Sequence, residues 1–180
     1  MKNIVLGVTG SIAAYKAADI TNTLVKSGYN VDVILTKGGM QFITPLTFQS
    51  LSKNRVHTHQ FDLNYPREVM HISLAKKADA FVVAPASADI IGKLANGIAD
   101  DMLSTVALAM RDIPCFIAPA MNTRMYENPI VQDNLQKLVK YGYQIIEPKK
   151  ALLACGDLGK GALADVSDIV RAIRGSLEKM

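Results

Sequence analysis

The sequence predicts an α/β fold in which helices cover both faces of one doubly wound parallel sheet. Apolar residues make up 49% and charged residues 20% of the 180 residues, a balance typical of a globular domain. Because aromatics are only 6% and Trp is absent, aliphatic side chains and Met must fill the core, as they do in parallel sheets. Buried strands also alternate with amphipathic helices along the chain. We therefore expect one domain over residues 1–180.

The first forty residues carry the clearest strand–helix–strand pattern. Residues 2–9 are almost all apolar or β-branched, which is typical of a strand buried on both faces. Apolar residues then recur at helical spacing from Ala13 to Leu24, with Ser11 expected as the N-cap and Gly28 as the terminator. Residues 30–35 form the next strand. Since a helix joins the two strands, we expect them to be parallel.

The same alternation continues to the end of the chain. Further strands are expected at residues 80–85, 114–119 and 144–147, and helices at residues 71–75, 88–96, 101–110, 130–142 and 165–177. The least regular stretches are residues 52–70 and 148–163. Because loops on a rigid α/β scaffold often carry function, both stretches are candidates for it.

Composition excludes several classes of function. The net charge of +4 is spread along the chain without a basic stripe or stacking aromatics, so we expect no nucleic-acid partner. No apolar run is long enough for a signal peptide or a membrane span, which favours a cytoplasmic protein. Cys115 lies in a buried strand and is expected in the core. His57 and His59 are expected at the surface, and without a third ligand at suitable spacing we expect no metal.

The turn after the first strand is a candidate phosphate site. A helix follows it, and the helix dipole and unpaired backbone N–H groups attract anions at such a point. Gly10 allows close approach of the backbone, and Ser11 offers a hydroxyl. Gly7 and Gly10 lack the third glycine of the dinucleotide fingerprint, which favours a mononucleotide. The alternative is an ordinary tight turn.

Three other segments carry candidate chemistry. The glycine-rich segment at Cys155 is no ATP-binding loop, because Lys160 is followed by Gly161 and not by Ser or Thr. It favours a closing flap in which Cys155 is either reactive or a chance surface cysteine. His71 is either a general base or a helix-start residue. Asn122 follows a predicted strand and either binds a carboxylate or amide or caps a helix.

Four ordered segments then resemble motifs of the homo-oligomeric flavin-containing cysteine decarboxylases. PAMNTRMYENP (residues 119–129) resembles the PxMNxxMW motif, and PASAD (residues 85–89) resembles the PASANT motif. The segment from His71 to Leu74 is similar to the one that carries the active-site histidine of the family. ACGDLGKGAL (residues 154–163) resembles the substrate clamp of the phosphopantothenoylcysteine decarboxylases.

The resemblance covers essentially the whole chain, including the opening GVTGSIAAYKA, and has two departures. Tyr126 replaces the Trp of PxMNxxMW, and Asp89 replaces the Asn of PASANT. These departures concern the geometry near flavin and substrate and not the class of reaction.

The resemblance implies a flavodoxin-like (Rossmann-like) sheet, an FMN cofactor, and a homotrimer or a dodecamer of trimers. The implied FMN-binding residues are Gly10, Ser11, Ile12, Thr36, Ser87, Ala88, Asp89, Ile90 and Ala120. The implied catalytic residues are His71, Asn122 and Cys155. The implied substrate-binding residues are Asn122, Met125, Ala154, Cys155 and Gly156.

The implied reaction is oxidative decarboxylation of 4′-phosphopantothenoylcysteine to 4′-phosphopantetheine, a step of coenzyme A biosynthesis. A cysteine carboxylate has no neighbouring electron sink. Oxidation of the thiol to a thioaldehyde by FMN provides one, so that loss of carbon dioxide gives an ene-thiolate that the reduced flavin then reduces. By resemblance, His71 serves the oxidation as a base or orienting group, Asn122 holds the carboxylate, and Cys155 donates a proton in the reduction.

Alternative functions remain at this stage. A lantibiotic-type peptidyl-cysteine decarboxylase shares the fold and FMN, but the ACGD-type clamp argues against it. A flavin prenyltransferase of related fold lacks the cysteine-bearing flap. A non-catalytic regulatory flavoprotein that inhibits a phosphatase would tend to lose the catalytic set, whereas His71, Asn122 and Cys155 are all present.

Overall fold

The computed structural model describes residues 1–61, 69–152, 156 and 158–179. Within these residues a five-stranded parallel sheet has the order β2-β1-β3-β4-β5, and β6 and β7 form a separate antiparallel hairpin. The strands are β1 (Asn3–Val8), β2 (Asn30–Leu35), β3 (Ala80–Ala86), β4 (Cys115–Pro119), β5 (Tyr143–Ile145), β6 (Lys149–Leu152) and β7 (Leu158–Ala162). The doubly wound parallel sheet is confirmed, and its order is that of flavodoxin.

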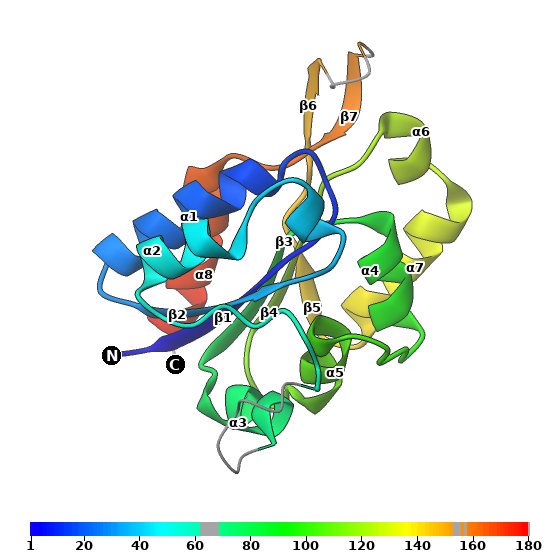
Figure 1. Cartoon of the computed structure of the whole chain (residues 1–180). Coiled ribbons are helices and arrows are strands. Elements are labelled where there is room, and N and C mark those ends of the chain that lie inside the picture. Colours follow the sequence, from blue (N-terminus) through cyan, green and yellow to red (C-terminus); the bar gives the residue numbers. More distant parts are fainter. Residues whose placement is uncertain (62–68, 153–155, 157, 180) are drawn as a thin grey trace.

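Helices cover both faces of the sheet (Figure 1). One face is covered by α1 (Ala14–Lys26), α2 (Pro45–Ser52) and α8 (Val166–Leu177). The other is covered by α3 (Met70–Lys77), α4 (Ala88–Ala95), α5 (Met102–Ala109) and α7 (Pro129–Lys140). The short η1 (Gly39–Gln41) and α6 (Thr123–Tyr126) follow β2 and β4. Strand side chains alternate between the faces, so Leu6 joins the first core and Val5 the second.

The strand order creates a crevice between β1 and β3. The chain leaves β1 toward α1 on one face and leaves β3 toward α4 on the other, although the two strands are neighbours. In open α/β sheets such a switch point, at the carboxyl ends of the strands, is where ligands bind. The fold therefore places the loops after Val8 and Ala86 beside each other.

Helix α1 differs from the expectation at its start and agrees at its end. It begins at Ala14 with Ala13 as N-cap, so the prediction that Ser11 is the N-cap is wrong. The Ser11 hydroxyl instead accepts a hydrogen bond from the backbone N–H of Ala13 at 3.3 Å, within a turn that precedes the helix. Gly28 follows the C-cap with φ +85°, the left-handed conformation expected of a helix terminator.

Three segments depart from the sequence-based expectations. Helix α2 was not expected, because Phe48 and Ser52 are its only buried side chains and give no apolar stripe. Strand β5 is shorter than predicted, since it spans Tyr143–Ile145 and so starts one residue and ends two residues before the expected bounds. Where irregular structure was expected near the end of the chain, β6 and β7 pair in an antiparallel hairpin.

His57 is buried, so the prediction that it lies at the surface is wrong, whereas His59 is exposed as expected. The backbone of His57 bonds to both Val33 and Leu35 at 2.9 Å and extends the sheet beyond β2. Burial lowers the pKa of its imidazole, and Asp32 opposes that shift. Cys115 is half-buried, and burial raises the pKa of its thiol to about 11.

No helix in the described part of the chain is both long enough and apolar enough to cross a membrane.

Candidate functional site

Two cavities open at the carboxyl end of the sheet, at the switch point. The first has a volume of about 460 Å³ and the second about 530 Å³. They meet at four residues that line both, namely Gly10, Ser87, Ala88 and Met125. Because three of these follow β1 or β3, the shared rim is built by the two loops that the fold brings together.

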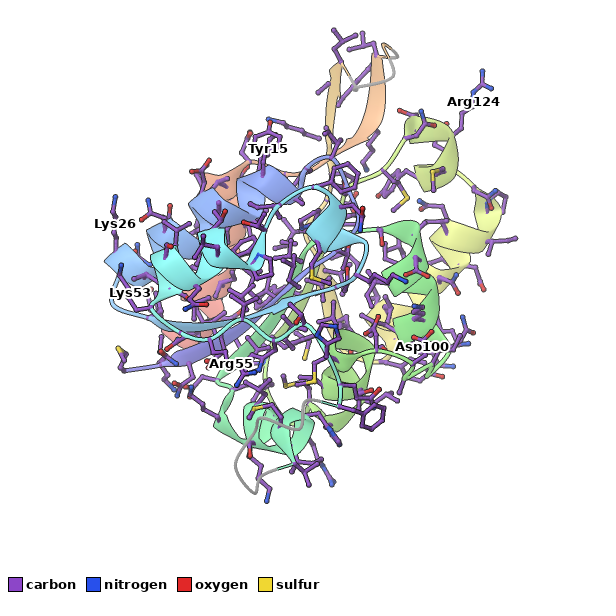
Figure 2. The ribbon with its side chains drawn as sticks, viewed as in Figure 1. Tyr15, Lys26, Lys53, Arg55, Asp100 and Arg124 are labelled. Carbon is purple, nitrogen blue, oxygen red and sulfur yellow. The ribbon has the colours of Figure 1, made fainter. Side chains whose placement is uncertain are left out.

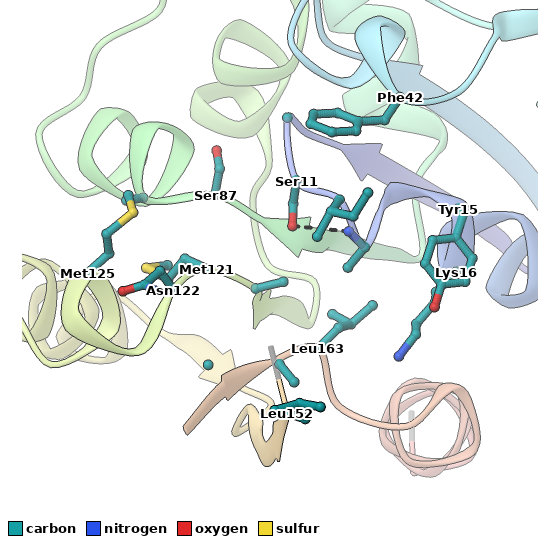
Figure 3. Close-up of a pocket in the computed structure, with 17 residues that line it drawn as sticks. Ser11, Tyr15, Lys16, Phe42, Ser87, Met121, Asn122, Met125, Leu152 and Leu163 are labelled. Atoms are coloured by element: carbon teal, nitrogen blue, oxygen red, sulfur yellow. Dashed lines mark hydrogen bonds between the residues drawn. The ribbon is translucent and has the colours of Figure 1, made fainter. Parts of the chain in front are cut away.

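The first cavity lies between helix α1, the loop after β4 and the β6–β7 hairpin (Figure 3). Tyr15 and Lys16 lie on one side of it and Asn122 and Met125 on the other. Phe42 lies at one end and Leu152 of the hairpin at another. Lys16 is the only charged side chain among the described residues that line this cavity. Its walls are otherwise mostly apolar.

The second cavity lies beside the carboxyl end of β2 and has a mixed charge. Thr36, Lys37 and Gly38 line it on the β2 side. Opposite them lies Lys93, whose Nζ is 3.4 Å from a carboxylate oxygen of Asp89, 3.1 Å from Asp100 and 3.7 Å from Asp101. Burial opposes the charge on Lys93, but the three carboxylates together raise its pKa.

The buried hydroxyl of Thr9 ties the two central loops together. It donates a hydrogen bond to the backbone carbonyl of Pro85 at 2.7 Å and accepts one from the backbone N–H of Ser87 at 2.9 Å. The Ser87 hydroxyl in turn accepts from the N–H of Ile90 at 3.4 Å and caps α4. The amino ends of α1 and α4 therefore open onto a common region.

Glycines bring the backbone of the β1–α1 loop against the turn after β2. A Cβ on Gly10 would lie 3.2 Å from the backbone of Gly38, closer than ordinary van der Waals contact. A Cβ on the buried Gly39 would lie 2.8 Å from the carbonyl oxygen of Val8. This close packing leaves little room for a side chain larger than that of glycine where Gly10 and Gly38 line the second cavity.

Most residues expected to bind cofactor or substrate line these cavities. They are Gly10, Ser11, Ile12, Thr36, Ser87, Ala88, Asp89, Ala120, Asn122 and Met125. The side chain of Ile90, by contrast, is buried in the core beneath α4 and lines neither cavity. Gly156 is exposed and has φ +88°. The expected residues Ala154 and Cys155 lie outside the described residues.

His71 lies away from both cavities in a single copy of the chain. It belongs to α3, which precedes β3 and lies at the end of the molecule opposite the β6–β7 hairpin (Figure 1). None of the described residues of α3 lines either cavity. One copy therefore brings Asn122 and the expected cofactor residues together, but not His71.

Both interpretations of Asn122 are compatible with its position. Its side-chain oxygen accepts a hydrogen bond from the backbone N–H of Arg124 at 2.8 Å and caps α6. The residue also lines the first cavity. Arg124 itself points outward from the tip of α6 and contributes no charge to the cavity (Figure 2). The cap holds the Asn122 amide at the cavity wall.

Several residues that line the cavities were not predicted from the sequence. They are Tyr15, Lys16, Lys37, Phe42, Met121, Lys93 and Leu152. Tyr15 and Lys16 lie one turn beyond the predicted phosphate site, and Lys37 directly follows Thr36, so sequence proximity could have indicated them. Phe42 and Leu152 come from distant segments and carry no local signal.

The donor set suits a flat organic ring that carries a phosphate. Two helix amino ends, of α1 and α4, and the hydroxyls of Ser11 and Ser87 offer donors for an anion near the shared rim. Ala120, Met121 and Met125 provide an apolar surface for a ring. Among the described residues, no group of three His, Cys, Asp or Glu side chains could hold a metal ion.

Comparison with known proteins agrees with this geometry. Residues 1–178 match the family described as Flavoprotein. The chain belongs to this family. It is 52% identical over 177 residues to a probable phosphopantothenoylcysteine decarboxylase of Streptococcus mutans, which covers 98% of this chain and 99% of that protein. The resemblance inferred from the motifs is confirmed.

Two further similarities agree with it. The chain is 49% identical over 170 residues to the coenzyme A biosynthesis bifunctional protein CoaBC of Bacillus subtilis, covering 94% of this chain but only 42% of that protein. A solved structure, a PPC decarboxylase mutant complexed with pantothenoylaminoethenethiol, matches with a TM-score of 0.87 and 32% identity over 98% of each chain. The family and the fold are thus supported by sequence and structure together.

The packing of Gly39 predicts that this position tolerates no side chain. A Cβ there would overlap Val8 and Leu35, so we expect Gly39→Ala to lower the free energy of unfolding by about 1–3 kcal/mol. The control is Gly92→Ala in α4, where the nearest atom would be 3.8 Å away and replacement of a helical glycine should stabilise by up to about 1 kcal/mol. Urea unfolding measures both, and equal stability of the two variants would contradict the prediction.

Proposed function

We propose that this chain is an FMN-dependent decarboxylase that converts 4′-phosphopantothenoylcysteine to 4′-phosphopantetheine in coenzyme A biosynthesis. The observation that carries the proposal is the pair of cavities at the switch point, one of them walled by both the Asn122 loop and the β6–β7 hairpin. These cavities occur in a chain that matches a probable phosphopantothenoylcysteine decarboxylase over almost its full length. The single lysine of the first cavity suits an anionic substrate, and its apolar wall suits the aliphatic part of the pantothenoyl chain.

FMN would be held by the residues around the shared rim. Gly10, Ser11 and Ile12 would face its phosphate at the amino end of α1, with Thr36 nearby at the end of β2. Ser87, Ala88, Asp89 and Ala120 would line the ring. When bound, FMN supplies a two-electron acceptor that takes electrons from the cysteine thiol and returns them after carbon dioxide has left. Contact from Ile90 stays a prediction.

The substrate would occupy the first cavity. Asn122 lines this cavity and would hold the substrate carboxylate through its side-chain amide. On the other side of the same cavity, Lys16 pairs with no carboxylate within 4 Å among the described residues and would attract the substrate phosphate. These two side chains would fix the two anionic ends of the molecule.

The position of His71 supports a homo-oligomer. In one copy α3 lies away from both cavities, so His71 can serve the reaction only if another copy brings it there. Val69 and Ile72 flank His71 and expose apolar side chains, which suits a surface covered by a second copy. We propose a trimeric unit in which His71 of one subunit acts as the base or orienting group at the cavity of the next.

Cys155 would complete the cycle by donating a proton to the ene-thiolate. It lies outside the described residues, but its sequence neighbours Leu152 and Gly161 line the first cavity. A lantibiotic-type peptidyl-cysteine decarboxylase and a non-catalytic flavoprotein are less well supported, because the chain carries the ACGD-type clamp motif and the first cavity carries Lys16 together with Asn122 and Met125. A cytoplasmic location and the absence of a nucleic-acid partner stay predictions.

Mass spectrometry tests the function directly. We expect purified, FMN-loaded protein to remove carbon dioxide from 4′-phosphopantothenoylcysteine and to release 4′-phosphopantetheine. A peptide ending in cysteine serves as the competing substrate. Turnover of the peptide alone would favour the peptidyl-cysteine decarboxylase, and a protein that binds no flavin and transforms neither substrate would contradict the proposal.

The role of His71 predicts complementation between subunits. His71→Asn should retain FMN and its yellow colour but lose decarboxylation, because the base is removed without changing the cavities of that copy. Asn122→Ala should also be inactive, because it removes the side chain that would hold the substrate carboxylate. Co-expression of the two variants should restore part of the activity, since some hybrid sites combine an intact His71 with an intact Asn122. Hybrids as inactive as the parents would show that His71 does not act across subunits.

The role of Cys155 predicts a change of product. Cys155→Ser should still oxidise and decarboxylate the substrate but fail to protonate the ene-thiolate, so that the oxidised ene-thiol product accumulates. Single-turnover mixtures analysed by mass spectrometry would show a product two hydrogens lighter than 4′-phosphopantetheine. Normal 4′-phosphopantetheine at the wild-type rate would remove Cys155 from the mechanism.

A further inference from the structure

The β6–β7 hairpin stands apart from the main sheet and depends on contacts at its base. Figure 1 shows it projecting beyond the carboxyl end of the sheet, beside α6. Leu152 of β6 and both Gly161 and Ala162 of β7 line the first cavity. The placement of the hairpin therefore fixes one wall of that cavity, while the loop that carries Asn122 forms another.

The backbone contact between these two walls is close but supplies little bonding. The N–H of Met121 donates to the carbonyl of Gly161 at 3.0 Å. A Cβ on Gly161 would overlap the Met121 carbonyl, and one on Gly159 would overlap the side chain of Thr123. The hydroxyl oxygen of Thr123 is buried there without a hydrogen-bond partner among the described residues. The steric fit between the two walls would not by itself stop the hairpin from tilting away from the loop that carries Asn122.

Three side chains from three segments add a polar connection at this point. Tyr126 ends α6 and is only 5% exposed, Glu147 precedes β6, and Lys160 lies in β7. The Tyr126 hydroxyl donates to Glu147 Oε2 at 3.1 Å, and Lys160 Nζ donates to the same oxygen at 2.6 Å. Lys160 Nζ also lies 5.4 Å from the centre of the Tyr126 ring, within the range of a cation–π contact.

Protonation favours this arrangement near neutral pH. Burial, and then the charge of Glu147, raises the pKa of the Tyr126 phenol, so the phenol keeps the proton that it donates. The hydrogen bond to Glu147 raises the pKa of Lys160, which stays positive. Tyr126 is also fixed to the substrate loop, because its N–H donates to the carbonyl of Asn122 at 2.9 Å.

We propose that Tyr126, Glu147 and Lys160 form a latch that holds the hairpin against the Asn122 loop and so positions the hairpin wall for substrate. They are positioning residues, since none of them lines the cavity among its described residues. The tyrosine that replaces the Trp of the PxMNxxMW motif takes part in this connection, because its phenol hydroxyl donates to Glu147 at 3.1 Å. The effect on substrate rests on the proposed function, whereas the mechanical effect does not.

Hydrogen exchange at the Met121 amide tests the latch without any substrate. Loss of an exposed ion pair should speed exchange of this amide roughly twofold to fivefold in Lys160→Gln and in Glu147→Gln. The matched control is Lys150→Gln, which removes an equal charge from the residue paired with Lys160 across the hairpin. Lys160→Arg should exchange like the wild type. Equal exchange in Lys160→Gln and Lys150→Gln would overturn the latch.

Steady-state kinetics on 4′-phosphopantothenoylcysteine test the positioning role. For Lys160→Gln we expect KM to rise roughly twofold to fivefold while kcat changes less, with recovery in Lys160→Arg and no change in Lys150→Gln. Faster Met121 exchange with an unchanged KM would overturn the positioning role. If the wild-type protein leaves this substrate untouched, the proposed function fails, and the exchange experiment still decides whether the latch exists.

Discussion

The hydroxyl of Thr9 is the contact on which the geometry of the site depends. It is 2% exposed and joins the ends of two neighbouring strands, donating to Pro85 and accepting from Ser87. Without it, two backbone groups of the β3–α4 loop would lose their partner in a buried place, at a cost of about 1–3 kcal/mol for each unsatisfied group. Strand β1 sends its helix to one face and the neighbouring β3 sends its helix to the other, and the Thr9 hydroxyl links the two chain segments from which these helices begin.

The two sides of the site are consequently held by different forces. On the sheet side, Thr9 and the close packing of Gly10 against Gly38 fix the backbone by burial and steric exclusion. On the hairpin side, one backbone hydrogen bond to Gly161 and one partly exposed ion pair hold the hairpin in place. The sheet side is thus tightly packed, whereas the hairpin side is held by fewer and more exposed contacts.

Sequence patterns predicted the central strands and placed most of the expected site residues at the two cavities, for one physical reason. Strands buried on both faces appear as unbroken apolar runs, and their carboxyl ends meet at one edge, so residues such as Ser11 and Ser87 could be placed together without the structure. The hairpin was missed because its short strands carry charged and small residues, without an apolar run, and bury little. His57 was assigned wrongly because its burial comes from pairing with β2, which no local pattern records. Lys16 and Leu152 likewise line one cavity only because distant segments of the chain meet there.

The two cavities differ in charge. The second is lined by Lys37 and Lys93 and by Asp89 and Asp101, so its positive and negative charges balance, and Lys93 also pairs with Asp100 outside the lining. No carboxylate lines the first cavity among the described residues, and Lys16 gives it a positive charge. An anionic ligand is therefore attracted more strongly to the first cavity than to the second. Asp89, which stands where the PASANT motif has Asn, adds a carboxylate to the second cavity, and Lys93 lies 3.4 Å from it. Because Lys93 follows one turn later on the same helix, α4, the departure from the motif leaves the lining of the second cavity without a net charge.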